Sequence, residues 1–162
     1  MTTDPFTVLP GSEREPLPGA TQTGPCDGNE TMQVTVVLRH RPASGNASLA
    51  DLVARGERLT PDEYAARYGA DPEDVKQIEA FAQAHSLTVS AVNLGARTAI
   101  LTGTVADFSR AFHVNLAYYQ YAGGTYRGRT GPVYVPTSLK EIIQAVLGLD
   151  NRPQARAHFR LR

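Results

Sequence analysis

The chain has few of the residues from which a catalytic or metal centre is usually built. Its single cysteine, Cys26, cannot form an internal disulfide and cannot hold a metal alone. None of the four histidines belongs to an H-x-x-x-H or HExxH pair: His40, His85, His113 and His158. No serine stands in a G-x-S-x-G turn. We therefore expect no catalysis by this chain alone, no cofactor and no bound metal.

Long apolar runs and phosphate-binding loops are missing as well. No stretch approaches the ~20 apolar residues of a membrane span, and residues 1–19 lack the basic start and apolar run of an ordinary signal peptide. The glycine-rich residues 122–132 contain no G-K-S or G-K-T sequence, so we interpret them as a loop. These absences argue against a membrane partner and against a nucleotide-binding enzyme.

The charge is balanced overall but unevenly distributed. The chain has 16 lysines and arginines and 16 aspartates and glutamates, which argues against a general polyanion binder. Residues 1–30 carry five acids and one arginine, a net charge of −4, whereas residues 152–162 carry four arginines and no acid, a net charge of +4. The basic C-terminal segment is therefore the feature that a function has to explain.

The beginning of the chain differs in character from the rest. Residues 1–31 contain nine of the 25 glycines and prolines and show no hydrophobic period, so we expect a disordered leader. Residues 32–41 are rich in β-branched side chains that alternate between two faces. This pattern predicts a strand with Val34, Val36 and Leu38 on one face.

Two helices are predicted by the same starting pattern, a capping residue followed by proline. Thr60 and Pro61 begin the first helix, which Gly69 ends, and Asp71 and Pro72 begin the second. The second helix carries an apolar stripe at helical spacing: Val75, Ile78, Phe81, Ala82 and His85. We interpret the histidine of this stripe as a residue at the edge of the core rather than as a ligand.

The next elements complete a recognisable order. Residues 87–103 predict an antiparallel hairpin with Gly95 in its turn. Thr104 then caps a helix over residues 105–112, and residues 113–121 alternate as a strand with an outer aromatic row. Strand, helix, strand, strand, helix, strand is the order of the α+β, ferredoxin-like split βαβ fold, a four-stranded antiparallel sheet with helices on one face. We assign this domain to residues 32–150.

The end of the chain is predicted to contain one more helix and then a linker. Residues 139–148 show amphipathic spacing, with Ser138 as the opening residue and Gly148 as the stop. Beyond Asp150 no hydrophobic spacing remains, so residues 151–162 are expected to form an extended linker.

Several of these segments together resemble the activation prodomains of kumamolisin-like sedolisins, the serine-carboxyl peptidases. They are VTVVLRHR, EYAARYGADPEDVKQIEAFAQAHSLTV, RTAILTGTVADFSRAFHVNL, YRGRTGPVYVP and QAVLGLDNRPQARAHFR, of which AVLGLDNRPQARAHFR is the most specific. The resemblance implies a propeptide that precedes a subtilisin-like catalytic domain, inhibits it, assists its folding and is removed by autocatalysis at acidic pH. It also implies that the catalytic serine, glutamate and aspartate lie in that domain, which is expected to follow residue 162, and that the protein is extracellular.

The resemblance gives the basic C-terminal segment a role as a linker that fills the protease cleft. A cleft binds its substrate as an extended strand, and Pro153 discourages a helix at the start of the segment. The residues expected in or beside the cleft are Arg156, Ala157, His158, Phe159 and Arg160. Phe159 offers an apolar anchor, and the arginines on either side can pair with acids around the cleft.

The domain is expected to dock through the sheet face that its helices leave open. Candidate docking residues are Thr35, Val37, Tyr119 and Tyr121. The helices are expected to cover the opposite face, which carries Val36, Leu116 and Ile100.

Two other functions stay open. A nucleic-acid-binding module of this fold could stack bases on Tyr119 and Tyr121 and bind phosphates through Arg127, Arg129 and the basic tail. The two central strands carry no aromatic residue, however, so we do not expect a nucleic-acid partner. A free-standing protease inhibitor is a closer alternative. Under every one of these interpretations we expect the isolated chain to be a monomer.

Overall fold

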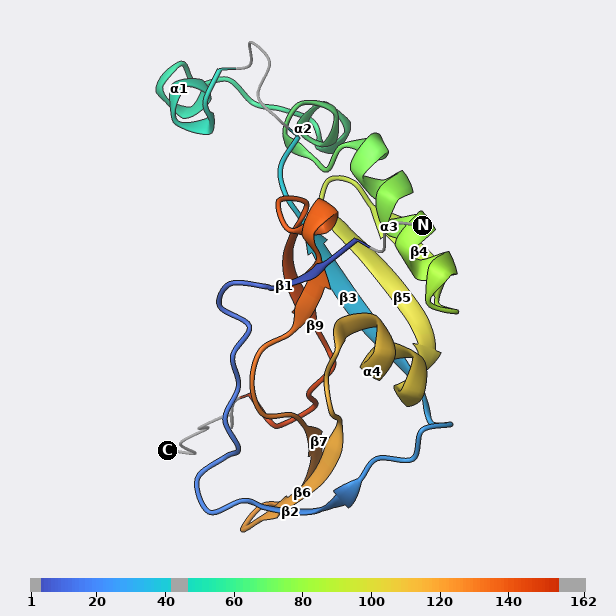
Figure 1. Cartoon of the computed structure of the whole chain (residues 1–162). Coiled ribbons are helices and arrows are strands. Elements are labelled where there is room, and N and C mark those ends of the chain that lie inside the picture. The colour runs from blue at the N-terminus through green and yellow to red at the C-terminus, as the bar shows by residue number, and fades with distance from the viewer. Residues whose placement is uncertain (1–3, 42–46, 155–162) are drawn as a thin grey trace, which may run out of the picture.

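The computed structural model describes residues 4–41 and 47–154, which fold as an α+β protein with antiparallel sheets (Figure 1). Its helices are α1 (Leu49–Ala54), α2 (Pro61–Tyr68), α3 (Pro72–Ala84) and α4 (Val105–Phe112), followed by the short 3-10 helix η1 (Thr137–Leu139). Within this part of the chain, no helix combines the length and the apolar character needed to cross a membrane.

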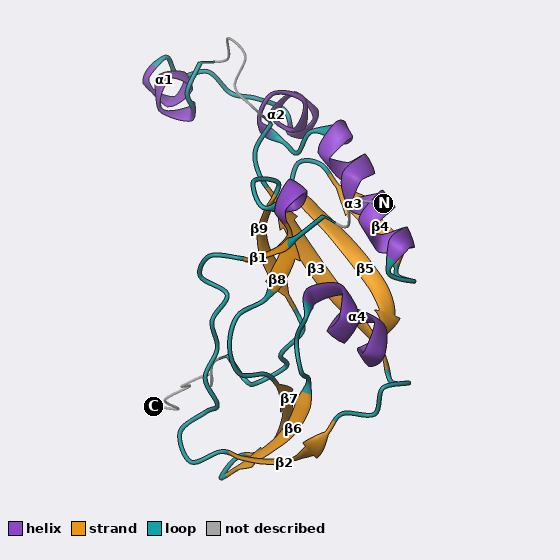
Figure 2. Cartoon of the chain, viewed as in Figure 1, coloured by secondary structure: helices purple, strands orange, loops and turns teal. Residues whose placement is uncertain are grey.

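The largest sheet has four strands and one covered face. Its spatial order is β4 (Thr88–Asn93), β5 (Thr98–Thr104), β3 (Thr31–Leu38) and β9 (Ile143–Leu147), and neighbouring strands are antiparallel. Val34, Val36 and Leu38 on β3 are fully buried. They share a core with the apolar side chains of α3 and α4, which cover this face (Figure 2). The prediction of this strand and of its buried face is confirmed.

Three helices begin where the sequence predicts. Thr60 and Glu63 form a reciprocal capping box at α2, and Asp71 accepts a backbone N–H in the first turn of α3. Thr104 and Asp107 form a second such box at α4. Each cap satisfies backbone N–H groups that the helix leaves free and is worth about 1 kcal/mol.

The predicted hairpin is formed by β4 and β5, but its turn differs in detail. Gly95 was expected to supply the turn, whereas the residue with a positive φ is Arg97, at 57°. Asn93 closes the turn by accepting the N–H of Ala96 at 2.9 Å. The guanidinium of Arg97 donates to the carbonyl of Leu38 at 2.7 Å, which compensates for the unusual backbone conformation.

The expected disordered leader is wrong for the residues that the structure describes. β1 (Phe6–Val8) pairs with β8 (Tyr134–Pro136), and β2 (Thr21–Pro25) pairs with β6 (Ala117–Tyr121), which also pairs with β7 (Gly124–Gly128). Leu9 and Cys26 are both buried. Strands of three and five residues are too short to show a period, and they are ordered by pairing with distant segments rather than by local propensity.

The fourth strand of the large sheet also differs from the prediction. Residues 113–121 were expected to supply it, but β6 belongs to the separate sheet β2–β6–β7. Residues 139–148 were expected to be helical, yet they contain the end of η1 and the whole of β9. Pairing with β3 is the physical reason, because the edge of β3 needs hydrogen-bond partners and β-branched Ile143 and Val146 pack well opposite it.

Candidate functional site

The predicted cleft-binding residues, Arg156 to Arg160, lie outside the described residues. The last described residues, Pro153 and Gln154, are exposed and belong to no helix or strand. The placement of the tail in a cleft therefore stays a prediction.

The chain immediately before the tail is held against β7. Arg127 on β7 donates from Nε to the carbonyl of Leu149 at 3.1 Å and from a terminal nitrogen to that of Gly148 at 3.3 Å. Its other terminal nitrogen pairs with Glu30 at 3.0 Å. The backbone of Arg127 also bonds Asn151 twice, donating to its Oδ1 at 2.7 Å and accepting its N–H at 3.0 Å. A single β7 residue thus fixes three residues of the departing segment.

Arg152 adds a second attachment at the same place. Its Nε lies 2.8 Å and 2.9 Å from the two carboxylate oxygens of Asp150, and one terminal nitrogen donates to the carbonyl of Glu15 at 2.6 Å. Its guanidinium also lies 5.2 Å from the centre of the Tyr126 ring. The hydrogen bond to Asp150 raises the pKa of Arg152. The first arginine of the basic segment is therefore bound to the body.

The open face of the four-stranded sheet is a neutral surface. The residues that lie opposite one another in register on this face are Gln33, Thr35, Val37, Thr98, Ile100, Thr102, Ala145 and Leu147. All carry uncharged side chains, and Leu147 is 51% exposed. Ile100 was expected on the covered face, but the register places it opposite Thr35, so that prediction is wrong.

The structure does not bring the predicted docking residues onto one face. Val37 lies on the open face of the large sheet, while Tyr119 and Tyr121 lie on β6 of the three-stranded sheet. Tyr119 is only 4% exposed: its ring stacks on Tyr126 at 5.3 Å, and its hydroxyl lies 3.1 Å from that of Thr130. The expected outer aromatic row is therefore wrong for Tyr119, which packs inside its own small core.

Arg127 and Arg129, considered for phosphate binding, are both buried. Arg129 donates to the carbonyls of Ser12, at 2.7 Å, and Gly131. Its burial lowers its pKa. Neither guanidinium is presented at the surface, where the phosphates of a nucleic acid would have to meet it.

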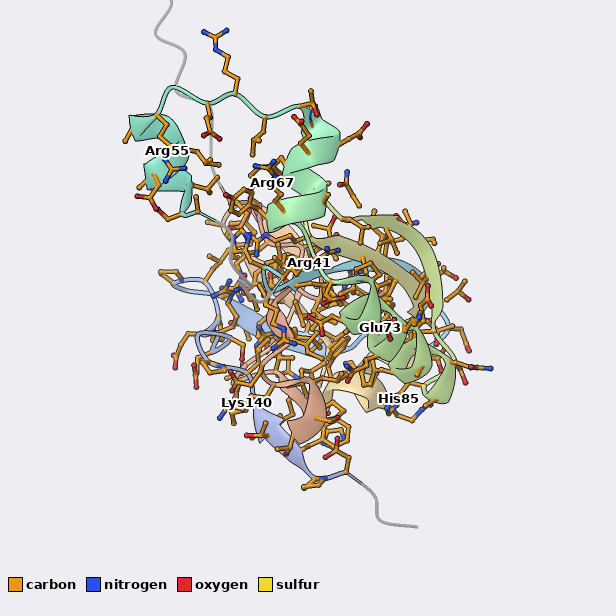
Figure 3. All side chains as sticks on the ribbon, turned by 90° about the horizontal axis from the view of Figure 1, so that it is seen from above. Arg41, Arg55, Arg67, Glu73, His85 and Lys140 are labelled. Carbon is orange, nitrogen blue, oxygen red and sulfur yellow. The ribbon has the colours of Figure 1, made fainter. Side chains whose placement is uncertain are left out.

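Two histidines that are far apart in the sequence meet around one ring. Phe6 stacks on His113 with ring centres 3.8 Å apart and meets His85 edge-on at 6.4 Å. His85 lies at the end of α3 opposite to Glu73 (Figure 3). Burial lowers the pKa of His85, and the nearby His113 lowers it further. Sequence reasoning missed this cluster because Phe6 lies in the segment expected to be disordered.

Among the described residues, no three or more histidine, cysteine or acidic side chains are grouped so that they could hold a metal ion. The features that the structure and sequence do offer are the neutral open face of the large sheet, the segment 148–152 held by Arg127, and the basic residues that follow it in the sequence.

Comparison with known proteins identifies relatives of the whole described body. Residues 18–152 match the family model described as "Pro-kumamolisin, activation domain". The chain is 40% identical to kumamolisin of Bacillus sp. strain MN-32 over 163 aligned residues, which cover 96% of this chain and 29% of kumamolisin. It is 25% identical to tripeptidyl-peptidase sed5 of Aspergillus fumigatus, covering 89% of this chain and 28% of that protein. The chain thus spans less than a third of each relative.

Proposed function

The chain belongs to the family of pro-kumamolisin activation domains, and we propose that it is the inhibitory and folding-assisting propeptide of an acid-active sedolisin, a serine-carboxyl peptidase. Its partner is then a subtilisin-like catalytic domain joined after residue 162, and the precursor is extracellular. The observation that carries the proposal is the family match over residues 18–152, which includes both the open face and the held exit.

The ferredoxin-like split βαβ arrangement belongs to the same proposal. It is supported by the chain order β3, α3, β4, β5, α4 and β9 and by the spatial order β4–β5–β3–β9 with antiparallel neighbours. In this arrangement the three-stranded sheet is an addition, with β6 and β7 placed between α4 and β9.

Docking occurs through the open face of the four-stranded sheet. The proposal is supported by the half-buried Val37 and Ile100 at the centre of that face and by the exposed Leu147 at its edge. An exposed group of uncharged side chains is typical of surfaces that another protein covers. Tyr121 is half-buried on β6, in the other sheet, so it can contact the peptidase only outside this face. Tyr119 is buried and supports docking only by packing within the three-stranded sheet.

The tail then occupies the active-site cleft as an extended strand. An occupying segment forms backbone hydrogen bonds as a substrate does and places alternate side chains in the subsites. Phe159 is the apolar anchor, and Arg156 and Arg160 pair with acids at the rim of the cleft. Cleavage within the tail ends the covalent link, and with it the high effective concentration that keeps the cleft filled.

Release at acidic pH follows from paired carboxylates. An acid that pairs across the interface has a lowered pKa in the complex, so its contribution to docking is present above its free pKa. That contribution is lost as the pH falls through the lowered pKa. We therefore expect the complex to weaken on acidification.

Inhibition by the separate domain tests the proposal. The target peptidase is the catalytic domain encoded after residue 162, or mature kumamolisin in its place. The wild-type chain should inhibit it near pH 7 and lose potency by about pH 3. Val37→Asp places a charge on the open face and should abolish inhibition, whereas Val53→Asp, at a side chain 78% exposed on α1, is the matched control and should not.

Two results would count against the proposal. Absence of inhibition by the wild-type chain would exclude the propeptide role, and equal potency at both pH values would exclude acid release. A reading frame that stops at residue 162 would favour a free-standing inhibitor instead.

A further inference from the structure

The segment between β9 and the tail, residues 148–152, forms its hydrogen bonds to the rest of the body with Arg127 of the three-stranded sheet and with Glu15, while Leu149 packs in the main core. We propose that Arg127, Asn151 and Arg152 form an exit clamp that fixes where the tail leaves the body and in which direction. This inference rests on the proposed function, because it gives the clamp the task of delivering the tail to the target peptidase.

The chemistry of the contacts favours rigidity. The side chains of Arg127 and Arg152 are about nine-tenths buried, at 10% and 12% exposure, and their guanidinium groups donate to backbone carbonyls on the segment itself and on residue 15. Charge-assisted hydrogen bonds in a buried setting are strong and directional. Asn151 pairs with the backbone of Arg127 through both its own N–H and its side chain, so the segment cannot shift along β7 without breaking both bonds.

The position of the clamp favours a role in delivery. Among the described residues, Leu149 is the last along the chain that belongs to the hydrophobic core. Asn151 and Arg152 lie beyond it, yet they make the contacts described above, although Asn151 is exposed as a residue; Pro153 and Gln154, which follow them, are both exposed. Proline fixes its own φ and stiffens the first residue after the clamp. The connection between the clamp and the proposed cleft segment at Arg156 is therefore only residues 153–155.

The close packing of the Asp150 side chain against β7 supports the same interpretation. A Cβ at Gly128 would lie 3.2 Å from a carboxylate oxygen of Asp150 and 2.6 Å from the Tyr126 ring. Gly148, with φ of 99°, lets the chain turn out of β9 toward β7. The departing segment thus leaves the backbone of β3 at Gly148 and packs closely against β7 at Asp150.

Polymer statistics give the expected size of the effect. With the clamp intact the connection has three residues, 153–155, and with the clamp released it has eight, 148–155. Effective concentration falls roughly as the −3/2 power of connection length, and the ratio of eight to three then gives a loss of about fourfold. A released clamp should weaken inhibition by about this factor through the tail alone.

A double-mutant cycle on the full chain tests the clamp. Asn151→Ala removes one of the two pairings with Arg127, and Asn151→Asp restores an acceptor at the same place. Thr60→Ala removes a similar uncharged side-chain-to-backbone bond at the start of α2, outside the sheet, and is the matched control. Each variant is prepared with and without Phe159→Ala, and its inhibition constant for the target peptidase and its unfolding midpoint are measured.

If the clamp acts through the tail, Asn151→Ala weakens inhibition by up to about fourfold, Asn151→Asp restores it, and the effect disappears in the Phe159→Ala background. Thr60→Ala changes only the unfolding midpoint. If Asn151→Ala raises the inhibition constant by the same factor in the wild-type and Phe159→Ala backgrounds, the clamp does not act through the tail. That result would overturn this inference and leave the propeptide role in place. Absence of inhibition by the wild-type chain would overturn both.

A second variant avoids any risk to folding. Insertion of five glycine and serine residues between Arg152 and Pro153 keeps every clamp contact but gives the same connection length as a released clamp. It should weaken inhibition by the same factor of about four. Unchanged inhibition by the insertion variant would show that the exit point does not matter and would overturn the inference.

Discussion

Substitution of Ile100 by alanine tests the docking face at its centre. Ile100 lies on β5, opposite Thr35 on β3, and is half-buried in the free domain. The substitution removes three carbon atoms, worth about 2.4 kcal/mol if all are buried, at about 0.8 kcal/mol each. About half of this already contributes to folding, so docking should lose about 1.2 kcal/mol, which corresponds to an inhibition constant about eightfold higher.

The assay compares inhibition of the target peptidase with thermal unfolding of the same samples. Val92→Ala is the control, because Val92 lies on β4, is 40% exposed and is paired with Ala99 of the covered face. It should change inhibition little. If Ile100→Ala lowers the unfolding midpoint but leaves the inhibition constant unchanged, this face is not the docking surface.

Three further predictions concern stability. The pKa of His85 is lowered in the folded domain, so below neutral pH the folded domain binds fewer protons than the unfolded chain. Stability should therefore fall as the pH decreases from neutral through ~6.5, the ordinary pKa of histidine, toward the lowered pKa. Unfolding midpoints measured across this range should decline less steeply for His85→Leu. Asp74, 3% exposed, binds Arg39 through both oxygens at 2.7 Å and 3.0 Å. Because Arg39 can still reach water, Asp74→Ala should cost about 2–3 kcal/mol in urea unfolding, below the full cost of breaking a buried pair, and a loss under ~0.5 kcal/mol would contradict this. Gly148→Ala forces a side chain into a positive φ of 99° beside the backbone of β3 and should lower the midpoint in a thermal scan, whereas Gly11→Ala, also at positive φ but with open space around it, should cost less.

The elements that the sequence predicted correctly carry their signal locally. The capping residues Thr60, Asp71 and Thr104 precede α2, α3 and α4, and each cap is a contact between residues only two or three positions apart. The alternation of Val34 and Val36 likewise reports a face that is buried along the whole of β3. Such features depend little on the rest of the fold and can be read directly from the order of residues.

The elements that were predicted wrongly depend on distant partners. The apolar spacing of residues 139–148 fits a helix, but the free edge of β3 makes β9 the better solution. β1 and β2 carry no period and are held by strands more than 90 residues away. Tyr119 alternates as an outward residue should, yet Tyr126 of the neighbouring strand covers it. The proposed docking face has the same dependence, because the residues that share the open face follow from the register of β3, β5 and β9, which pairs segments distant in the sequence.

The two parts of the candidate site are joined by consecutive residues. Leu147 is the last residue of β9 and lies on the open face, and Gly148 is the first residue that Arg127 holds. A body docked through the open face therefore places the clamp at a fixed distance from the target peptidase, with no residue between the two parts. Only residues 153–155 then separate the clamp from the proposed cleft segment. With so short a connection, the position of the docked sheet would limit where the cleft segment can lie. If the tail fills the cleft as proposed, the basic segment would need no folding signal in its own sequence, because the clamp would set the residue at which it leaves the body.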